Sequence, residues 1–178
     1  MRGVVIILIC GFMGAGKTTF LNELQKSSCT GSFLDLDHEI FLRSGTGHQD
    51  LTELIGDVGW QEFRSLELKI LNELKIGSEG QGSDLFISLG GGAVTEKLLE
   101  LKQSWDDCFL VWLNTPLSTC LERIVGDKSR PLTTKGPKYL KELYSQREEY
   151  YQKADTCLYA SNQDRIWTAK TLKEHLLS

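Results

Sequence analysis

The stretch Gly-Phe-Met-Gly-Ala-Gly-Lys-Thr-Thr occupies residues 11–19 and directly follows the apolar run VVIILIC at residues 4–10. It matches the pattern G-x-x-x-x-G-K-[ST], whose glycines let the backbone wrap a phosphate so that N–H groups point inward. A helix-like segment begins at Lys17, and the positive end of a helix also attracts phosphate. The sequence therefore predicts a nucleoside-triphosphate site on a strand–loop–helix unit. Its expected binding residues are Gly14, Ala15, Gly16, Lys17, Thr18 and Thr19.

Strand-like and helix-like segments alternate along the 178 residues. We expect strands at 4–10, 32–37, 85–89, 108–113 and 156–160. We expect helices at 17–25, 39–44, 51–55, 60–75, 95–101, 116–125, 139–153 and 165–177. This order predicts a single α/β domain over residues 1–178, in which helices cover both faces of a five-stranded parallel sheet. The polar segment 77–84 is expected to be a flexible loop, and residues 126–138 a mobile lid.

Composition narrows the class of protein. Apolar residues make up 40% and charged residues 25% of the chain, and the net charge is −4 without a basic cluster. Nucleic acid and anionic membrane surfaces are therefore not expected partners. The apolar run at 4–10 is expected to be a first strand rather than a signal peptide, and no run is long enough to span a membrane. The five scattered cysteines indicate reduced thiols and a cytoplasmic location.

The destination of the terminal phosphate is the harder question. A GTP-hydrolysing switch needs the motifs N-K-x-D and D-x-x-G, and the chain contains neither. A motor ATPase usually has an acid at the end of a buried strand, but LFISL (85–89) and CFLVWL (108–113) end without one. Instead, Asp35 and Asp37 end the second expected strand, beside the phosphate loop. These absences favour transfer of the phosphate to another molecule over hydrolysis.

The two carboxylates suit a phosphoryl-transfer site. One can support Mg²⁺ and its waters, and the other can face an acceptor hydroxyl and take its proton. Taken alone, the pair Asp35 and Asp37 is also typical of helix-capping acids, because a helix is expected directly after it. The neighbouring phosphate loop makes the functional interpretation the stronger one. Mg²⁺ is then expected on the hydroxyl of Thr18.

Arginines and a triple glycine indicate an anionic acceptor. Arg64, Arg130 and Arg147 follow the acids along the chain, and arginines stabilise a phosphoryl group in transfer and clamp carboxylates in two-bond geometry. The segment Gly90-Gly91-Gly92 follows a strand and lets a substrate approach backbone N–H groups. Together these residues predict a small, hydroxylated, anionic acceptor.

At this point the sequence resembles the shikimate kinase family over nearly its whole length. The matching motifs are the phosphate loop, Asp35-Leu36-Asp37, Phe63-Arg64 with Glu67, Gly90 to Val94, Arg130-Pro131-Leu132, and Arg147 with Tyr150, Ala154 and Asp155. Each later motif is short, but six in the same order are specific. The resemblance implies a monomer with a kinase fold like that of nucleoside-monophosphate kinases. It also implies transfer of phosphate from ATP to the 3-hydroxyl of shikimate, a step of chorismate and aromatic amino-acid biosynthesis.

The resemblance assigns roles by position. It implies that Lys17 and Thr18 serve ATP and Mg²⁺, that Asp35 supports the metal through water, and that Asp37 holds the acceptor hydroxyl. The substrate-binding segment is expected at about residues 37–68. Further implied roles are the shikimate carboxylate for Arg64 and Arg147, shikimate contacts for Gly90, Gly91 and Gly92, the adenine for Arg123, and the phosphates for the lid residue Arg130.

Two departures from the family pattern lie near the expected acceptor site. The family often has Gly-Glu shortly before Phe-Arg, whereas this chain has Gly59-Trp60, and the segment around residues 45–50 is a few residues longer. Two alternatives also stay open. Another small-acid kinase, such as a gluconate kinase, shares the phosphate loop but not this ordered set of motifs. A nucleotide-binding regulator would show no turnover with any sugar acid.

Overall fold

The computed structural model describes residues 3–27, 30–124, 136–159 and 167–178. Its strands are β1 (Ile6–Cys10), β2 (Ser32–Asp35), β3 (Leu85–Ser88), β4 (Cys108–Asn114) and β5 (Thr156–Tyr159). Its helices are α1 (Lys17–Lys26), α2 (Leu36–Ser44), α3 (Leu51–Gln81), α4 (Glu96–Gln103), α5 (Leu117–Ile124), α6 (Gly136–Tyr151) and α7 (Ala169–Leu176).

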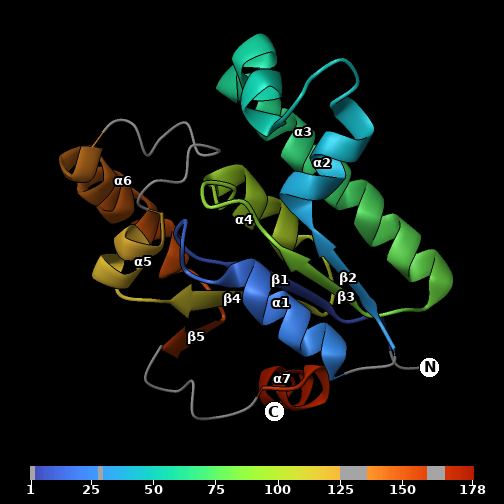
Figure 1. The fold of residues 1–178 in the computed structure, drawn as a ribbon. Helices are drawn as coiled ribbons and strands as arrows, with labels where there is room; N and C mark the ends of the chain where they lie inside the picture. Colours follow the sequence, from blue (N-terminus) through green and yellow to red (C-terminus); the bar gives the residue numbers. More distant parts are fainter. Residues whose placement is uncertain (1–2, 28–29, 125–135, 160–166) are drawn as a thin grey trace.

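The strands form one parallel sheet in the order β2-β3-β1-β4-β5 (Figure 1). The predicted five-stranded parallel sheet is therefore confirmed. Because the strands are parallel, their carboxyl ends meet at one edge. The register pairs Ile9 of β1 with Ser88 of β3, and Asp35 of β2 with the same Ser88. The segments that follow these three strands therefore lie close together.

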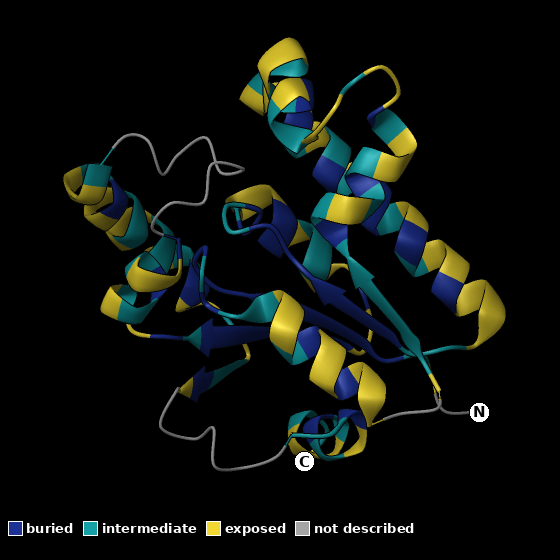
Figure 2. Cartoon of the chain, in the orientation of Figure 1, coloured by how far each residue is buried: buried dark blue, intermediate teal, exposed yellow. Residues whose placement is uncertain are grey.

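Side chains of β1 alternate between two hydrophobic cores, one on each face of the sheet. Ile6 and Leu8 face the core formed with α2 to α6, whereas Ile7 and Ile9 face the core formed with α1 and α7. Figure 2 shows the central strands in dark blue, and α1 with a buried inner side and an exposed outer side. Burial on both faces explains why β1 is a continuous apolar run.

The second expected strand is shorter than predicted. β2 ends at Asp35, and α2 begins at Leu36, so Asp37 lies in the first turn of a helix rather than at the end of a strand. The Asp35 side chain accepts a hydrogen bond from the backbone N–H of His38 at 3.4 Å and caps the helix. The capping interpretation is therefore correct for Asp35, and the strand prediction over 32–37 is wrong at its end. Leu36, the first residue of α2, is fully buried.

Helix α3 confirms one prediction and corrects another. The expected helices at 51–55 and 60–75 are two helical segments of α3, separated by Gly59, whose φ of 79° and ψ of 161° are non-helical. The helix also continues through most of 77–84, the expected loop, and ends at Gly82 in left-handed conformation. The polar composition of that loop was misleading because Ser78 is buried and its hydroxyl hydrogen-bonds to the carbonyl oxygen of Ser83.

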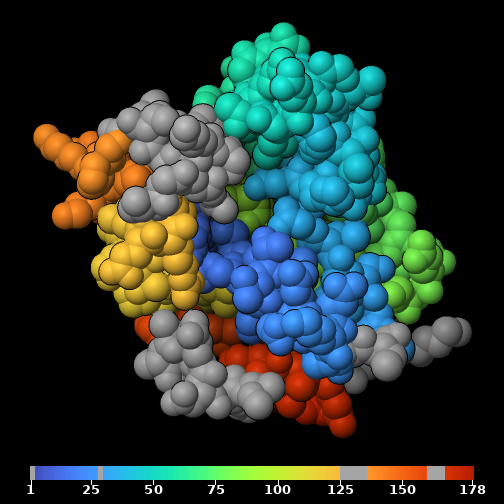
Figure 3. Space-filling view, in the orientation of Figure 1, coloured from blue at the N-terminus to red at the C-terminus, as the bar shows by residue number. Residues whose placement is uncertain are grey.

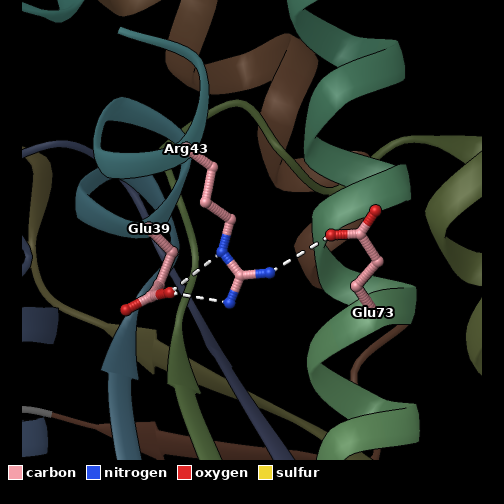
Figure 4. Close-up of polar contacts among 3 residues, drawn as sticks. All are labelled: Glu39, Arg43 and Glu73. Carbon is pink, nitrogen blue, oxygen red and sulfur yellow. Dashed lines mark hydrogen bonds and ion pairs between the residues drawn. The ribbon is translucent and has the colours of Figure 1, made fainter. Parts of the chain in front are cut away.

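An arginine joins α2 to α3 (Figure 4). Arg43 donates from Nη2 to Glu39 at 3.0 Å and from Nη1 to Glu73 at 3.2 Å. Because Arg43 and Glu73 are partly exposed, the bridge contributes at most about 1 kcal/mol to folding. Buried residues of the two helices, such as Ile40 and Ile70, belong to the same core and hold them together more strongly.

Most of the predicted lid, residues 126–135 with Arg130, lies outside the described residues, as does residue 125 of the expected helix 116–125. The last lid residues, 136–138, form the first turn of α6. Residue 160 of the last expected strand and residues 165–166 of the closing helix also lie outside them. In the part of the chain that the structure describes, no helix is long and apolar enough to cross a membrane.

We expect Gly59→Ala to destabilise the protein by about 1–3 kcal/mol, because the backbone at Gly59 is in a region open essentially only to glycine. Urea unfolding measures this change. Gly56→Ala is the matched control, since a methyl group there would meet nothing within 4 Å and Gly56 lacks a positive φ. That control should be neutral or stabilise by up to about 1 kcal/mol. Equal effects of the two substitutions would contradict a special backbone at Gly59.

Candidate active site

The phosphate loop connects β1 to α1, as predicted. Gly14 and Gly16 have φ values of 80° and 94°, and α1 begins at Lys17 without a side-chain cap on its first N–H groups. Lys17 folds over the loop, and its ammonium donates hydrogen bonds to the carbonyl oxygens of Gly11 at 2.9 Å and Phe12 at 3.1 Å. Unclaimed N–H groups at a helix start and a nearby ammonium form an anion site.

Thr18 and Asp35 come together from different elements. The hydroxyl of Thr18, at the start of α1, donates to Asp35 Oδ2 at 2.9 Å. A hydroxyl and a carboxylate are hard oxygen ligands, which Mg²⁺ prefers, and this metal usually retains several waters and substrate oxygens. The pair therefore fits a magnesium ion held beside the phosphate loop.

A cavity of about 260 Å³, called here the arginine cavity, lies beside the phosphate loop. It brings together Met13 from the loop, Asp37 from α2, Trp60, Phe63, Arg64 and Glu67 from α3, the glycines 90–92, and Arg147 from α6. These residues are separated by up to 134 positions in the sequence, from Met13 to Arg147. The cavity thus collects the predicted substrate-binding residues, Asp37, Arg64, Gly90, Gly91, Gly92 and Arg147.

The glycines allow charged groups to reach the floor of the arginine cavity. A Cβ atom added at Gly92 would lie 2.6 Å from Arg64 Nη2 and 2.7 Å from Arg147 Nη2, so any side chain there would collide with both. A Cβ atom added at Gly90 would lie 2.6 Å from Asp37 Oδ1. Gly90 and Gly92 therefore leave room for two cations and one carboxylate to approach the backbone closely.

Arg147 is the more buried of the two cations. Its Cζ atom lies 5.7 Å from the centre of the Phe12 ring, and its Nη1 atom is buried without a hydrogen-bond partner among the described residues. Burial lowers the pKa of the Arg147 guanidinium, and the neighbouring Arg64 charge lowers it further. A buried donor without a partner is costly, so this group is suited to an anion that enters the cavity.

Glu67 was absent from the predicted site residues, although it was noted within the Phe63-Arg64 motif. It is 2% exposed and forms an ion pair with Arg64, while its Oε1 atom has no hydrogen-bond partner in the described part of the chain. Burial raises the pKa of Glu67 to about 7, against the lowering effect of Arg64, and the Asp37 charge raises it further. The sequence signal that could have identified Glu67 is its spacing from Arg64, because residues three positions apart lie one helical turn apart and can pair.

A second cavity of about 500 Å³, called here the loop cavity, lies on the other side of the phosphate loop. It is lined by Ala15, Gly16 and Thr19 of the loop region and by Arg123 of α5, all predicted to bind ATP. Arg123 donates from Nη1 to the carbonyl oxygen of Gly14 at 3.1 Å. In Figure 3, blue atoms of the N-terminal region lie in a depression between α5, in yellow, and α1.

Sequence reasoning missed two aromatic residues of the loop cavity. Tyr159 at the end of β5 and Trp167 before α7 both line it. Neither belongs to a motif, and they approach the phosphate loop only because β5 and α7 pack at this side of the sheet. The ring of Trp167 contacts the ring of His175 at 5.3 Å between centres. Arg130, predicted to bind ATP phosphates, lies outside the described residues.

Comparison with known proteins agrees with this geometry. The family model described as shikimate kinase matches residues 13–176. A shikimate kinase of Persephonella marina is 34% identical over 157 residues, which cover 87% of each chain. One from Neisseria meningitidis serogroup C is 35% identical over 161 residues, which cover 88% of each chain.

Solved structures agree as well. A shikimate kinase from Acinetobacter baumannii in complex with shikimate has a TM-score of 0.75 and 30% identity, and the match covers 98% of this chain and 91% of that one. The shikimate kinase of Aquifex aeolicus has a TM-score of 0.71 and 25% identity, with 97% and 94% covered.

The parallel sheet and the phosphate loop, together with these relatives, define a small-molecule kinase with a fold like that of nucleoside-monophosphate kinases. The family model covers nearly the whole length of the chain. The chain therefore belongs to the shikimate kinase family.

We expect Glu67→Gln to change how stability depends on pH. Because the folded-state pKa of about 7 exceeds the ordinary value of 4.5, the folded protein binds this proton more tightly than the unfolded chain. Stability from this group is therefore fully present below pH 4.5 and is lost as the pH rises through about 7. The unsubstituted protein should lose up to about 3 kcal/mol relative to Glu67→Gln across that window.

Urea unfolding at several pH values, without ligand, measures this difference. Glu62→Gln is the control for removing an acid from an exposed position of the same helix. A difference between the unsubstituted protein and Glu67→Gln that stays constant from pH 4.5 to pH 8 would show that Glu67 does not titrate abnormally.

Proposed function

We propose that this protein transfers the γ-phosphoryl group of ATP to the 3-hydroxyl of shikimate, giving shikimate 3-phosphate and ADP. Membership of the shikimate kinase family supports this activity. Within the family pathway, the reaction is a step of chorismate and aromatic amino-acid biosynthesis. The solved relative from Acinetobacter baumannii, with shikimate bound, supports the same acceptor.

The observation that carries the proposal is the pair of guanidinium groups in the arginine cavity. Arg64 Nη2 and Arg147 Nη2 both lie within 3 Å of the position that a Cβ atom would take at Gly92. Two positive charges this close repel each other, and an anion bound between them relieves this repulsion. A carboxylate fits two planar donors in bidentate geometry. Arg64 and Arg147 therefore bind the shikimate carboxylate in this proposal.

Asp37 suits the reacting hydroxyl. Its Oδ1 atom lies close to Gly90, and it lines the same cavity as Met13 of the phosphate loop. The acceptor oxygen forms a bond to the γ-phosphorus, and the bond between that phosphorus and the β,γ-bridging oxygen breaks. The hydroxyl proton passes to Asp37, and ADP leaves with the electron pair of the broken bond. Glycines 90–92 provide backbone contacts for the acceptor ring.

The phosphate loop holds the donor. In this proposal, backbone N–H groups of Gly14 and Gly16, with those of Thr18 and Thr19 at the start of α1, bind the phosphates, and Lys17 supplies positive charge. Ala15, whose N–H donates to the carbonyl oxygen of Phe12 at 3.0 Å, lines the site. Thr18 and Asp35, whose side chains lie 2.9 Å apart, would hold Mg²⁺, and Asp35 would act through water. Mg²⁺ neutralises charge on the β- and γ-phosphates when bound. Arg123 borders the adenine, and Arg130 remains a predicted phosphate contact.

Release of ADP tests the function directly. With ATP and Mg²⁺, we expect release that depends on shikimate, with gluconate and an assay without acceptor as controls. Turnover with gluconate instead would assign the chain to another small-acid kinase activity, and ATP binding without any turnover would favour a regulator. Either result would overturn the proposed function.

Asp37→Asn removes the proposed proton acceptor while keeping the shape of the side chain. We expect kcat to fall by about 10²–10⁴, the usual contribution of a positioned base, while ATP affinity stays unchanged. Steady-state rates and ATP binding by calorimetry measure the two quantities. Near-normal turnover would remove Asp37 from the reaction.

Arg147→Ala removes the buried clamp. We expect the KM for shikimate to rise by about 30-fold or more, since a desolvated charge pair commonly contributes 2 kcal/mol or more. The KM for ATP should change little, because Arg147 lies in the arginine cavity and not in the loop cavity. An unchanged KM for shikimate would place its carboxylate elsewhere.

A further inference from the structure

Trp60 occupies an unusual place in the arginine cavity. It lines the cavity and yet is 43% exposed, so it lies at the boundary between the cavity and solvent. The shikimate kinase family often has glutamate after the glycine at this point, and this chain has Gly59-Trp60. No role assigned so far uses this residue.

The sequence spacing places Trp60 on the same face of α3 as Phe63 and Arg64, which are three and four positions later. The rings of Trp60 and Phe63 meet edge to face, with centres 6.0 Å apart and planes at 88°. The Arg64 Cζ atom lies 5.2 Å from the centre of the Trp60 ring and 5.7 Å from that of Phe63. The guanidinium therefore lies against two aromatic rings.

The other contacts of Arg64 are made by its nitrogen atoms. Nη1 donates to Glu67, and Nη2 is directed toward Gly92, next to Arg147. A cation–π contact uses attraction between the positive charge and the ring and takes no N–H donor. Contact with the Trp60 indole therefore restricts the position of the Arg64 guanidinium and leaves its remaining N–H donors available to a ligand.

We propose that Trp60 is a positioning residue for the anionic acceptor, holding the Arg64 guanidinium so that its free N–H edge faces the acceptor carboxylate. This inference rests on the proposed function, because it takes the ligand of the arginine cavity to be a carboxylate. Restricting a long side chain before binding lowers the entropy cost of immobilising it in the complex. Trp60 therefore increases acceptor affinity and leaves the chemical step unchanged.

The backbone beside Trp60 supports this role. Gly59 interrupts the helical conformation directly before Trp60, and the continuous helix resumes toward Phe63, Arg64 and Glu67. Trp60 therefore starts the same rigid segment that holds Arg64.

Steady-state kinetics of Trp60→Leu and Trp60→Phe test the proposal. Leucine keeps an apolar side chain without a π system, and we expect the KM for shikimate to rise about five- to tenfold, the size of a partly desolvated cation–π contact. Phenylalanine keeps a smaller ring and should restore most of the affinity. The kcat and the KM for ATP should stay within about twofold in both variants.

Trp105→Phe is the matched control. Trp105 also has a cation near its ring, Lys75 Nζ at 6.0 Å, but it lines neither cavity. Its substitution should leave the KM for shikimate unchanged. Tryptophan fluorescence adds a readout that does not need turnover: shikimate should change the emission of the unsubstituted protein and of Trp105→Phe, and this response should be lost in Trp60→Phe.

A double-mutant cycle tests whether Trp60 acts through Arg64. In an Arg64→Ala background, Trp60→Leu should raise the KM for shikimate little further. An equal rise in both backgrounds, a KM within twofold of normal in Trp60→Leu, or a fall in kcat alone would each overturn the proposal. If Trp60→Leu fails to fold, the fluorescence response of Trp60→Phe decides, and a full response rejects the proposal.

The unsubstituted protein separates this inference from the proposed function. Absence of shikimate-dependent ADP release from that protein rejects both. Normal release from it, combined with an unchanged KM in Trp60→Leu, rejects only the role of Trp60.

Discussion

Burial of β1 on both faces is the constraint on which the site depends. Its residues Ile6 to Cys10 are at most 1% exposed, and the strand pairs with β3 on one side and β4 on the other. A central parallel strand must end at the same edge as its neighbours, so the phosphate loop meets the segments after β2 and β3 there. The arginine cavity and the loop cavity are consequently both lined by residues of the phosphate loop.

Charge balance in the arginine cavity explains why its side chains are so closely packed. Arg64 and Arg147 bring two positive charges near Gly92, and Glu67 and Asp37 bring two carboxyl groups. Burial favours the neutral form of Glu67 and opposes the effect of its arginine partner. When Glu67 is protonated, the cavity carries a net positive charge, which suits an acceptor with one carboxylate.

Much of the fold was predictable because the sequence patterns of buried strands and of the phosphate loop follow from local physical preferences. The strand–loop–helix unit, the parallel sheet and the order of the motifs were all correct, since buried strands and phosphate loops have strong sequence patterns. Errors arose where packing overrides local preference. The polar segment 77–84 continues α3, with Ser78 buried, and Asp37 lies in the first turn of α2, directly after the buried Leu36. By contrast, the break expected before Trp60 is present, because Gly59 has a non-helical backbone within α3.

By itself, the sequence determined the class of chemistry: glycines 11–16 and Lys17 specify a phosphate site, and the spacing of acids and arginines indicates an anionic acceptor. Tertiary structure alone decided how those charges act. Three features depend on how α3, α6 and the triple glycine pack together. They are the contact of Trp60 with Arg64, the raised pKa of Glu67, and the burial of the Arg147 Nη1 atom, which has no hydrogen-bond partner among the described residues. Desolvation and proximity are properties of packed elements, and motif spacing along the chain does not specify them.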